Sequence, residues 1–477
     1  MIALEAAERL GCEVPYEVKN HMTSRLSYWK TIYSGNGVSW ATVGYDQVDK
    51  PRKRMLLKPA KTLAQYISRL NMSECSIAVD GEQRQRLVNE VLRRNHFFQN
   101  ARRADERKEA LGGMVIKPYV SNGEILIDFV RPENFVPLTW DNRGITEAVF
   151  ISRTIRNQIY YTKAELHRFD DMGRLCIDTH LFSSQSENDL GDESELDRIP
   201  QLAGVNPHIV LSRSEPIFSY IYPSIADSDI SDCPLGISRF ADADDVIKAC
   251  DIAFDEVQIE RLMAEKMIFA SQYMVDKSID IDGMPKIRYN HDTRVFQILN
   301  IDGKENQMPE TFDPSFKINE HIKDLQTQLD LLCFKCNLDV GSLSFDGRDG
   351  VKTATEIRSQ NSKTYSTVAD NQAILSAAFE NMIRTILWMG GEMGLISPVL
   401  PDEAEVKVTF DDSVTPDHDT FIKEGVLLLQ CGAISKRRFM TEYRGLTEDE
   451  ADSEIARINA ENGAASVDLF GNLEGGA

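Results

Sequence analysis

Three acids near residue 240 have the residue types of a two-metal nuclease site. Asp242, Asp244 and Asp245 could bind divalent cations, because carboxylate oxygens are the ligands that such sites use. On a helix, Asp244 and Asp245 would diverge by about 100°, and only Asp242 would share a face with Asp245. No His or further acid joins them in a recognisable motif. Acids in a first helical turn also complement the helix dipole, so the cluster favours capping and solvation over catalysis.

Two further motifs resemble metal or redox sites but lack essential ligands. Ser278-Ile-Asp280-Ile-Asp282-Gly283 is similar to the front half of a calcium loop, yet Ser278 and Tyr289 stand where that loop has acids. We interpret it as a polar hairpin turn. Cys333-Phe-Lys-Cys336 is a CxxC pair without a second CxxC or paired His at ligand spacing, which favours packing in a core.

Motifs for nucleotide hydrolysis or hydrolase chemistry are absent. The sequence has no GxxxxGK(S/T) phosphate loop, no GxSxG elbow and no HExxH pair. We therefore predict no catalytic residue, no bound metal and no cofactor. The most unusual loop combines acids, bases and glycines, and by itself it is typical of a surface turn: Asp346, Gly347, Arg348, Asp349, Gly350, Val351 and Lys352.

A helix of unusual length is predicted over Pro234–Lys266. After Gly236 about thirty residues pass without Pro or Gly, which corresponds to roughly 45 Å of helix, whereas helices average about 11–12 residues. Its apolar positions keep a seven-residue rhythm, typical of a seam between helices. The seam includes Phe240, Ala243, Ile247, Cys250, Phe254 and Val257, and the acids on the rest of the surface include Asp242, Asp245, Asp251, Asp255, Glu256 and Glu260.

A second helix with the same rhythm is predicted over Lys317–Leu338, where Ile318, Ile322, Leu325, Leu329 and Leu332 form the seam. The two helices bracket a short, turn-rich β segment, and a third long helix is predicted over Thr353–Gly390. Strands are predicted over Cys75–Val79, within Gly113–Phe182 and over Val406–Phe410, with a polar acidic loop over Ser183–Asp197. Shorter helices complete an α+β fold class. They are predicted over residues 3–33, Lys61–Leu70, Gln83–Phe98 and Asn100–Leu111, the last two rich in Arg and Glu, and over His418–Cys431, Ser435–Arg444 and Thr447–Glu461.

Composition narrows the possible partners. The 477 residues carry a net charge of −22, which argues against a protein that wraps nucleic acid with basic surface, but not against one that nucleic acid must pass without sticking. No apolar run approaches the roughly 18 residues of a membrane span, and no secretory signal is predicted. Eight sparse cysteines fit a reducing compartment.

Five segments in order resemble the phage portal protein family, in the branch common among tailed phages of Gram-positive hosts. The resemblance rests on the five segments together and on their order along the chain. The first, Pro234-Leu-Gly-Ile-Ser-Arg-Phe240, is similar to the entry of the family's stem helix. The others are Asp128–Val136 with Thr146–Ile155, Met267–Ala270, Lys352–Ile357 with Ser359–Thr364, and Cys431–Lys436 with Tyr443–Thr447.

The resemblance implies a ring, expected to be a dodecamer, at one capsid vertex, through which double-stranded DNA is packaged and ejected. It implies as partners the terminase large subunit, which would supply ATP hydrolysis, head-completion or adaptor proteins, and the major capsid and scaffold proteins. The protein would assemble in the host bacterial cytoplasm and reside in the virion. The implied domains are a wing (1–234 and 338–416, including the tunnel loop and long helix), a stem (235–266 and 317–337), a clip (267–316), a crown (417–463) and a disordered tail (464–477).

The same resemblance gives the singled-out residues their expected roles. The helix acids would form a wall that repels DNA, and residues 346–352 would be the tunnel loop, with Arg348 and Lys352 as candidates for transient phosphate contact. The seam would pack against the same helices of the neighbouring subunit. This subunit-packing seam comprises Phe240, Ile247, Cys250, Phe254, Val257, Ile322, Leu325 and Leu329.

Two other classes of function remain open from the residues. One is a metal-dependent enzyme that processes nucleic acid with its acidic clusters, and the other is a non-viral helical scaffold protein. Ring-shaped particles would favour the portal prediction. Magnesium-dependent DNA cleavage that is lost in Asp242→Ala or Asp245→Ala would favour the enzyme.

Overall fold

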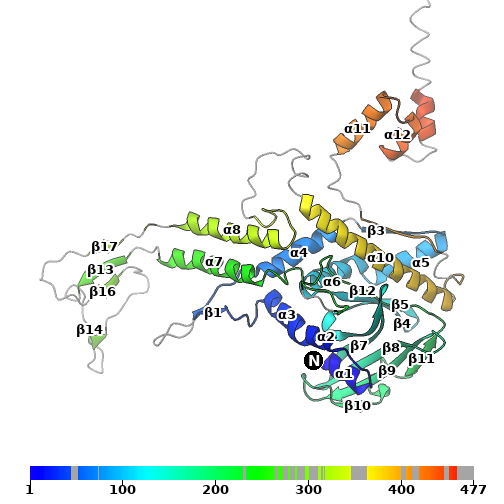
Figure 1. Ribbon diagram of the computed structural model, residues 1–477, viewed down its shortest axis with the longest axis horizontal. Helices are drawn as coiled ribbons and strands as arrows, with labels where there is room; N and C mark the ends of the chain where they lie inside the picture. Colours follow the sequence, from blue (N-terminus) through cyan, green and yellow to red (C-terminus); the bar gives the residue numbers. More distant parts are fainter. Residues whose placement is uncertain are drawn as a thin grey trace, which may run out of the picture. The chain divides into compact units, whose positions relative to one another are not determined.

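The protein is described by a computed structural model, in which helices and strands form two compact units (Figure 1). The units are residues 1–348 with 362–410, and residues 349–361 with 411–477. The structure describes residues 1–43, 52–73, 75–228, 232–263, 267–271, 278–279, 285–286, 296–299, 310–312, 315, 317–344, 362–398, 404–410, 418–444 and 451–458.

Helices of the first unit agree closely with the sequence prediction, apart from one start. The N-terminal helical region is α1 (Ile2–Arg9), α2 (Tyr16–Asn20), a π-helical turn η1 (His21–Arg25) and α3 (Leu26–Ser34). The other helices are α4 (Pro59–Asn71), α5 (Glu82–Arg94), α6 (Phe97–Leu111), α7 (Asp244–Met263), α8 (Ile318–Lys335) and α10 (Ser362–Glu392). None of the helices within the described ranges has the length and apolar character that crossing a membrane requires.

Three antiparallel sheets build the body of the first unit. The largest has the order β10-β9-β8-β7-β6, with β11 also paired to β9, and the second has the order β12-β4-β5. In the third, β3 (Cys75–Val79) pairs with β18 (Val406–Phe410). The remaining bounds are β4 (Met114–Ser121), β5 (Glu124–Val130), β6 (Phe135–Asp141), β7 (Gly144–Arg156), β8 (Ile159–Phe169), β9 (Leu175–Ser184), β10 (Asp192–Ser194), β11 (His208–Leu211) and β12 (Ser219–Ile221).

The β segment between α7 and α8 forms small sheets of its own. Strands β13 (Met267–Ser271), β16 (Phe296–Leu299) and β17 (Glu310–Phe312) have the order β16-β13-β17. Ser278–Ile279 (β14) pairs with Pro285–Lys286 (β15), which confirms the predicted hairpin. A further short ribbon pairs β1 (Thr42–Val43) with β2 (Arg52–Lys53).

The longest described helix, α10, lies at the centre of one core. Leu375, Phe379, Ile383 and Ile386 recur along one face and are fully buried, as the period of an amphipathic helix requires. They share a core with α5, α6, β4 and β18. The predicted helix over Thr353–Gly390 is confirmed from Ser362 onward, and its first residues lie outside the described ranges.

Two predicted elements differ from the structure. The long helix begins at Asp244 rather than at Pro234, because the backbone of Gly236 is bonded elsewhere: its N–H donates to Tyr220 Oη at 2.9 Å, and its carbonyl lies 3.0 Å from His21 Nε2. A side chain at Gly112 would also lie 2.4 Å from the Gly236 carbonyl oxygen. Within the predicted loop Ser183–Asp197, Asp192–Ser194 forms β10, paired with β9.

The second unit is helical over its described residues, as predicted. It contains α11 (His418–Gln430), α12 (Lys436–Glu442) and a helical stretch over 451–458. Ser435 begins α12 by accepting a hydrogen bond from the Arg438 N–H at 3.2 Å, which satisfies one of the free donors of the first turn. The Gly- and Ala-rich tail lies outside the described residues.

Candidate functional site: paired helices and a buried polar junction

Helices α7 and α8 lie side by side and antiparallel. The start of α7 meets the end of α8, where Lys335 Nζ lies 2.9 Å from Asp245 Oδ1. The end of α7 meets the start of α8, where the Lys317 N–H donates to Glu260 Oε1 at 2.9 Å. The two helices that bracket the β segment in the sequence are therefore one helical pair within the chain.

The seam between these helices is filled by the chain itself. Phe240, Ile247, Cys250, Leu325 and Leu329 are buried in one core with residues of α3 and α4. Phe254 and Val257 pack against that core, whereas Ile322 is 44% exposed. The prediction that the buried seam residues pack against a neighbouring subunit is wrong, because the seven-residue rhythm is satisfied by α8, α3 and α4 of the same chain.

Two acids of the predicted exposed wall are buried instead. Asp251 accepts hydrogen bonds from Trp40 Nε1 at 2.9 Å and from the backbone N–H groups of Leu57 and Lys58 at 2.9 and 3.0 Å. Asp255 accepts a bidentate pair from Arg52 at 2.9 and 2.5 Å. They fix the segment before α4 to α7, so neither belongs to a surface that repels DNA.

Burial affects these two carboxyl groups differently. It raises the pKa of Asp251, against the hydrogen bonds from Trp40 and the backbone. It would also raise the pKa of Asp255, but the bonds and charge of Arg52, aided by Arg54, lower the pKa below its ordinary value. The ion pair with Arg52 of β2 therefore keeps the buried Asp255 carboxyl group charged.

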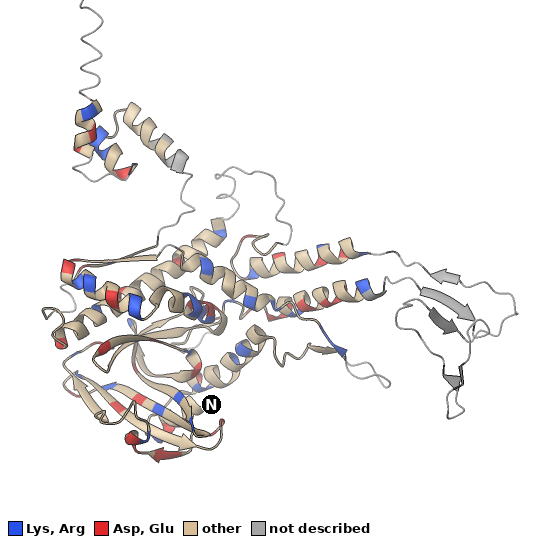
Figure 2. Ribbon diagram, turned by 180° about the vertical axis from the view of Figure 1, so that it is seen from behind, with Lys and Arg blue, Asp and Glu red and all other residues tan. Residues whose placement is uncertain are grey.

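The other predicted wall acids remain at the surface. Asp242, Asp245 and Glu256 are exposed, Glu260 is half-buried, and acidic positions run along both paired helices (Figure 2). Asp242 precedes α7, so it does not share a helical face with Asp245 as a nuclease pair would. Across the residues that the structure describes, no three His, Cys, Asp or Glu side chains are placed to hold a metal ion.

The CxxC pair packs in the core, as predicted. Cys333 and Cys336 are buried at the end of α8, and both are free thiols. Burial raises the pKa of Cys333 to about 11 and that of Cys336 to about 12, so both sulfur atoms stay protonated at neutral pH. The loop from Asp346 to Lys352 lies outside the described residues.

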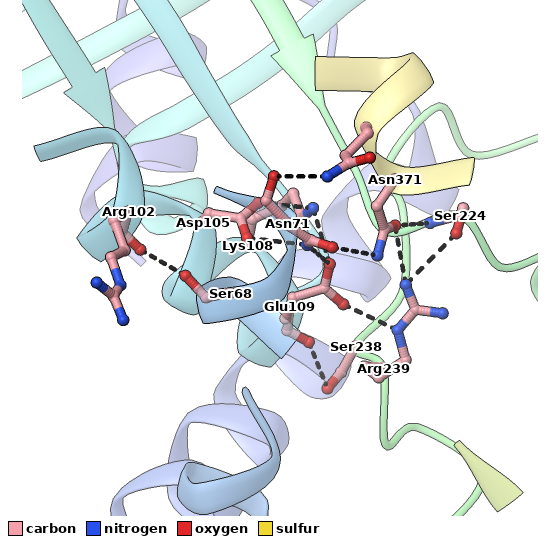
Figure 3. Close-up of polar contacts among 11 residues, drawn as sticks. Ser68, Asn71, Arg102, Asp105, Lys108, Glu109, Ser224, Ser238, Arg239 and Asn371 are labelled. Carbon is pink, nitrogen blue, oxygen red and sulfur yellow. Dashed lines mark hydrogen bonds and ion pairs between the residues drawn. The ribbon is translucent and has the colours of Figure 1, made fainter. Parts of the chain in front are cut away.

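A buried polar junction joins α4, α6, α10 and the segment that leads into α7 (Figure 3). Glu109 Oε2 accepts from Arg239 Nε at 2.8 Å, and Lys108 Nζ lies 2.8 Å from an oxygen of each of Asp105 and Glu109. Asn71 Nδ2 donates to Asp105 and Glu109 at 3.0 and 3.2 Å. Two acids and two cations thus neutralise each other out of contact with water.

The amide of Asn371 extends this junction to α10. Its Oδ1 accepts from Arg239 Nη2 at 2.9 Å and from the Ser224 N–H at 3.0 Å, while its Nδ2 donates to Asn71 Oδ1 at 3.3 Å. The Arg239 N–H also donates to the Glu109 carbonyl at 2.8 Å. One side chain of α10 is therefore tied to the residues before α7 and to α4.

The pKa values of the junction follow from burial and pairing. Burial, together with the charge of Glu109, raises the pKa of Asp105 despite the nearby Lys108. Burial would also raise the pKa of Glu109, but Arg239 and Lys108 outweigh it and lower the pKa to about 2. Both acids in turn raise the pKa of Lys108 against its burial. The charged groups of the junction are all buried, so the junction joins these segments of the chain and does not meet a substrate.

The junction is not predicted from the sequence, because α6 has the composition of a solvated, charged helix. A signal was present: Asp105 and Lys108 recur with the apolar Ala101 and Ala104 on one helical face. Charged residues on an apolar face indicate a buried ion pair when acids and bases are balanced. The partner Arg239, 130 residues away, is not visible from α6 alone.

Residues 16–468 match the family model described as phage portal protein, SPP1 Gp6-like. The chain belongs to this family of portal proteins, and it is therefore a component of virions.

Other comparisons add the following findings. No curated protein matches the chain. A solved structure titled virion of native gene transfer agent particle is similar at 9% identity with a TM-score of 0.40, covering 91% of this chain and 94% of that one.

Proposed function

We propose that the protein is the subunit of a ring, of about twelve copies, that forms the portal vertex of a tailed-phage capsid. The family match over residues 16–468 carries this proposal. Within the subunit, α7 and α8 form the stem, residues 267–316 the clip, residues 417–463 the crown, and the remaining body the wing. The antiparallel stem pair supports this division, because the end of α7 and the start of α8, which flank the clip segment, lie next to each other.

Double-stranded DNA would pass through the ring during packaging and ejection. The net charge of −22 and exposed acids such as Asp245 and Glu256 support a wall that does not hold phosphate. Residues 346–352 would narrow the channel, with Arg348 and Lys352 touching the DNA in passing. The terminase large subunit and later the head-completion proteins would dock on the clip, and the major capsid and scaffold proteins would surround the wing.

Purified full-length protein is expected to form ring-shaped particles. Mass photometry should show a species of about twelve 53.9 kDa subunits, and negative-stain microscopy should show a central hole. Particles of one or two subunits under every condition would contradict the proposal. Magnesium-dependent DNA cleavage, abolished in Asp245→Ala, would instead support an enzyme.

Deletion of Gly347–Gly350 is expected to leave ring assembly intact and to impair DNA packaging at least tenfold, because the channel loses the segment that contacts the passing duplex. Packaging is measured as nuclease-protected DNA in an infection complemented with the variant. Loss of the rings themselves would show that the loop is needed for assembly rather than for DNA movement.

A further inference from the structure

Helix α6 separates its charges by face. Asp105, Lys108 and Glu109 point into the buried junction, where they are neutralised by one another and by Arg239. The exposed side of the helix carries three arginines, and Figure 3 shows the side chain of one of them directed away from the junction. These arginines are Arg102, Arg103 and Arg107.

Helix α4, which packs against α6, carries a fourth exposed arginine. Ser68 Oγ donates to the Arg102 carbonyl at 2.7 Å, and Arg69, the next residue, is exposed. We call Arg69, Arg102, Arg103 and Arg107 the arginine face. The half-buried acid on this side of α6, Glu106, accepts a hydrogen bond from Tyr33 Oη at 2.5 Å.

The arginine face is not neutralised by the protein. Within the described ranges, no carboxylate lies within 4.0 Å of any of its four guanidinium groups. Helix α5 is built differently, since three of its four arginines, Arg84, Arg86 and Arg94, each pair with an acid four residues earlier, at 2.6–2.7 Å. In a chain with a net charge of −22, four exposed arginines without an acidic partner on two packed helices are a local concentration of positive charge.

We propose that the arginine face binds the phosphate backbone of double-stranded DNA. Guanidinium groups make bidentate hydrogen bonds with phosphate oxygens, and such contacts hold DNA without reading its sequence. The proposal rests on the proposed function, and it places a DNA-binding surface on α4 and α6, apart from residues 346–352.

Duplex DNA fits this surface better than a protein partner does. Protein interfaces depend on buried aromatic or aliphatic anchors surrounded by a polar rim. Along α6, Phe98 is the one large apolar side chain that is exposed, at 44%. Positions 103 and 107 lie one helical turn apart, so their guanidinium groups can reach successive phosphates of one strand.

Fluorescence anisotropy with a labelled DNA duplex of random sequence tests the proposal on the full-length protein. The variant combines Arg69→Gln, Arg102→Gln, Arg103→Gln and Arg107→Gln. We expect its Kd at low salt to rise roughly tenfold or more. The slope of log K against log salt should become shallower by about 0.9 for each phosphate that the variant no longer neutralises.

The matched control is Arg84→Gln with Arg86→Gln, which removes a half-buried and an exposed arginine that are each paired with an acid. It should leave both Kd and slope unchanged. Because the four arginines are exposed, the variant should keep the wild-type thermal unfolding midpoint, and the pair Arg103→Gln with Arg107→Gln should show an intermediate slope.

Three results would overturn the proposal. One is equal DNA binding by the variant and the wild type while both form rings. Another is wild-type binding of poly-glutamate but not of the duplex, which would identify a site for an acidic protein. The third is loss of rings in the folded variant, which would place the face against a neighbouring subunit. An absence of rings in the wild type would instead contradict the proposed function.

Discussion

Replacing Arg239 by methionine is expected to lower the free energy of unfolding by about 3–5 kcal/mol, the usual cost of breaking a buried ion pair by removing one partner. The Arg239 side chain is 1% exposed and that of Glu109 is fully buried. Methionine fills much of the same volume. The loss of stability therefore comes from the uncompensated charge of Glu109 and from the lost hydrogen bond that Arg239 donates to Asn371 Oδ1. Urea titration at fixed protein concentration measures the change, because the stability of an oligomer depends on concentration.

A double-mutant cycle separates the ion pair from simple loss of packing. Glu109→Gln should also destabilise the protein, and the double variant should lose clearly less than the two single losses combined. Arg143→Met is the control, since Arg143 is 89% exposed and pairs with Asp141 in a turn; its loss should stay below about 0.5 kcal/mol. Additive losses of unfolding free energy for the Arg239 and Glu109 variants would show that the two side chains do not stabilise the protein as a pair.

The Asp251→Ala variant is expected to lose about 2–4 kcal/mol of stability. Alanine leaves one buried and two partly buried donors without an acceptor, and one unsatisfied buried group costs roughly 1–3 kcal/mol, partly relieved by local relaxation. Trp40 should become more mobile, because its indole Nε1 loses the bond that holds it against α7. Urea titration measures the stability, and tryptophan fluorescence reports the local change.

Two variants make this result specific to the hydrogen bonds. Asp251→Asn keeps an acceptor oxygen and should cost less than alanine does. Glu256→Ala removes an exposed acid of the same helix and should change stability by less than about 0.5 kcal/mol. Equal, small effects for Asp251→Ala and Glu256→Ala would mean that Asp251 is solvated, as the sequence prediction had it.

Local patterns predicted most elements of this protein. Cys75–Val79 and Val406–Phe410 were both predicted as strands with the bounds that the structure has. Their pairing was not predicted, because hydrogen bonds between strands more than 300 residues apart leave no local signature. Strand β6 was missed as a separate element within the predicted β region.

The seam shows how a correct pattern can be assigned a wrong partner. The seven-residue rhythm correctly identified Phe240, Ile247, Cys250, Leu325 and Leu329 as packing positions. A repeat records that a face is buried, but it does not record which helix covers it. Here α8, α3 and α4 of the same chain cover it.

Whether a charged side chain is buried or exposed was the property predicted least reliably from the sequence. Asp251 and Asp255 were predicted to be exposed, because acids are rarely buried without partners. Their partners, Trp40, the backbone of residues 57–58 and Arg52, come from a segment some 200 residues earlier. Glu109 and Arg239 escaped notice for the same reason.

The sequence by itself determined the family, the helices and strands with most of their bounds, and the absence of a recognisable catalytic motif, because these depend on local periodicity and on short motifs in order. The tertiary structure decided which apolar face meets which, which acids are buried, where α7 begins, and that Arg239 is tied to Glu109 and Asn371. Those outcomes depend on contacts between distant segments, where a buried charge is stable only if the fold brings its partner to it.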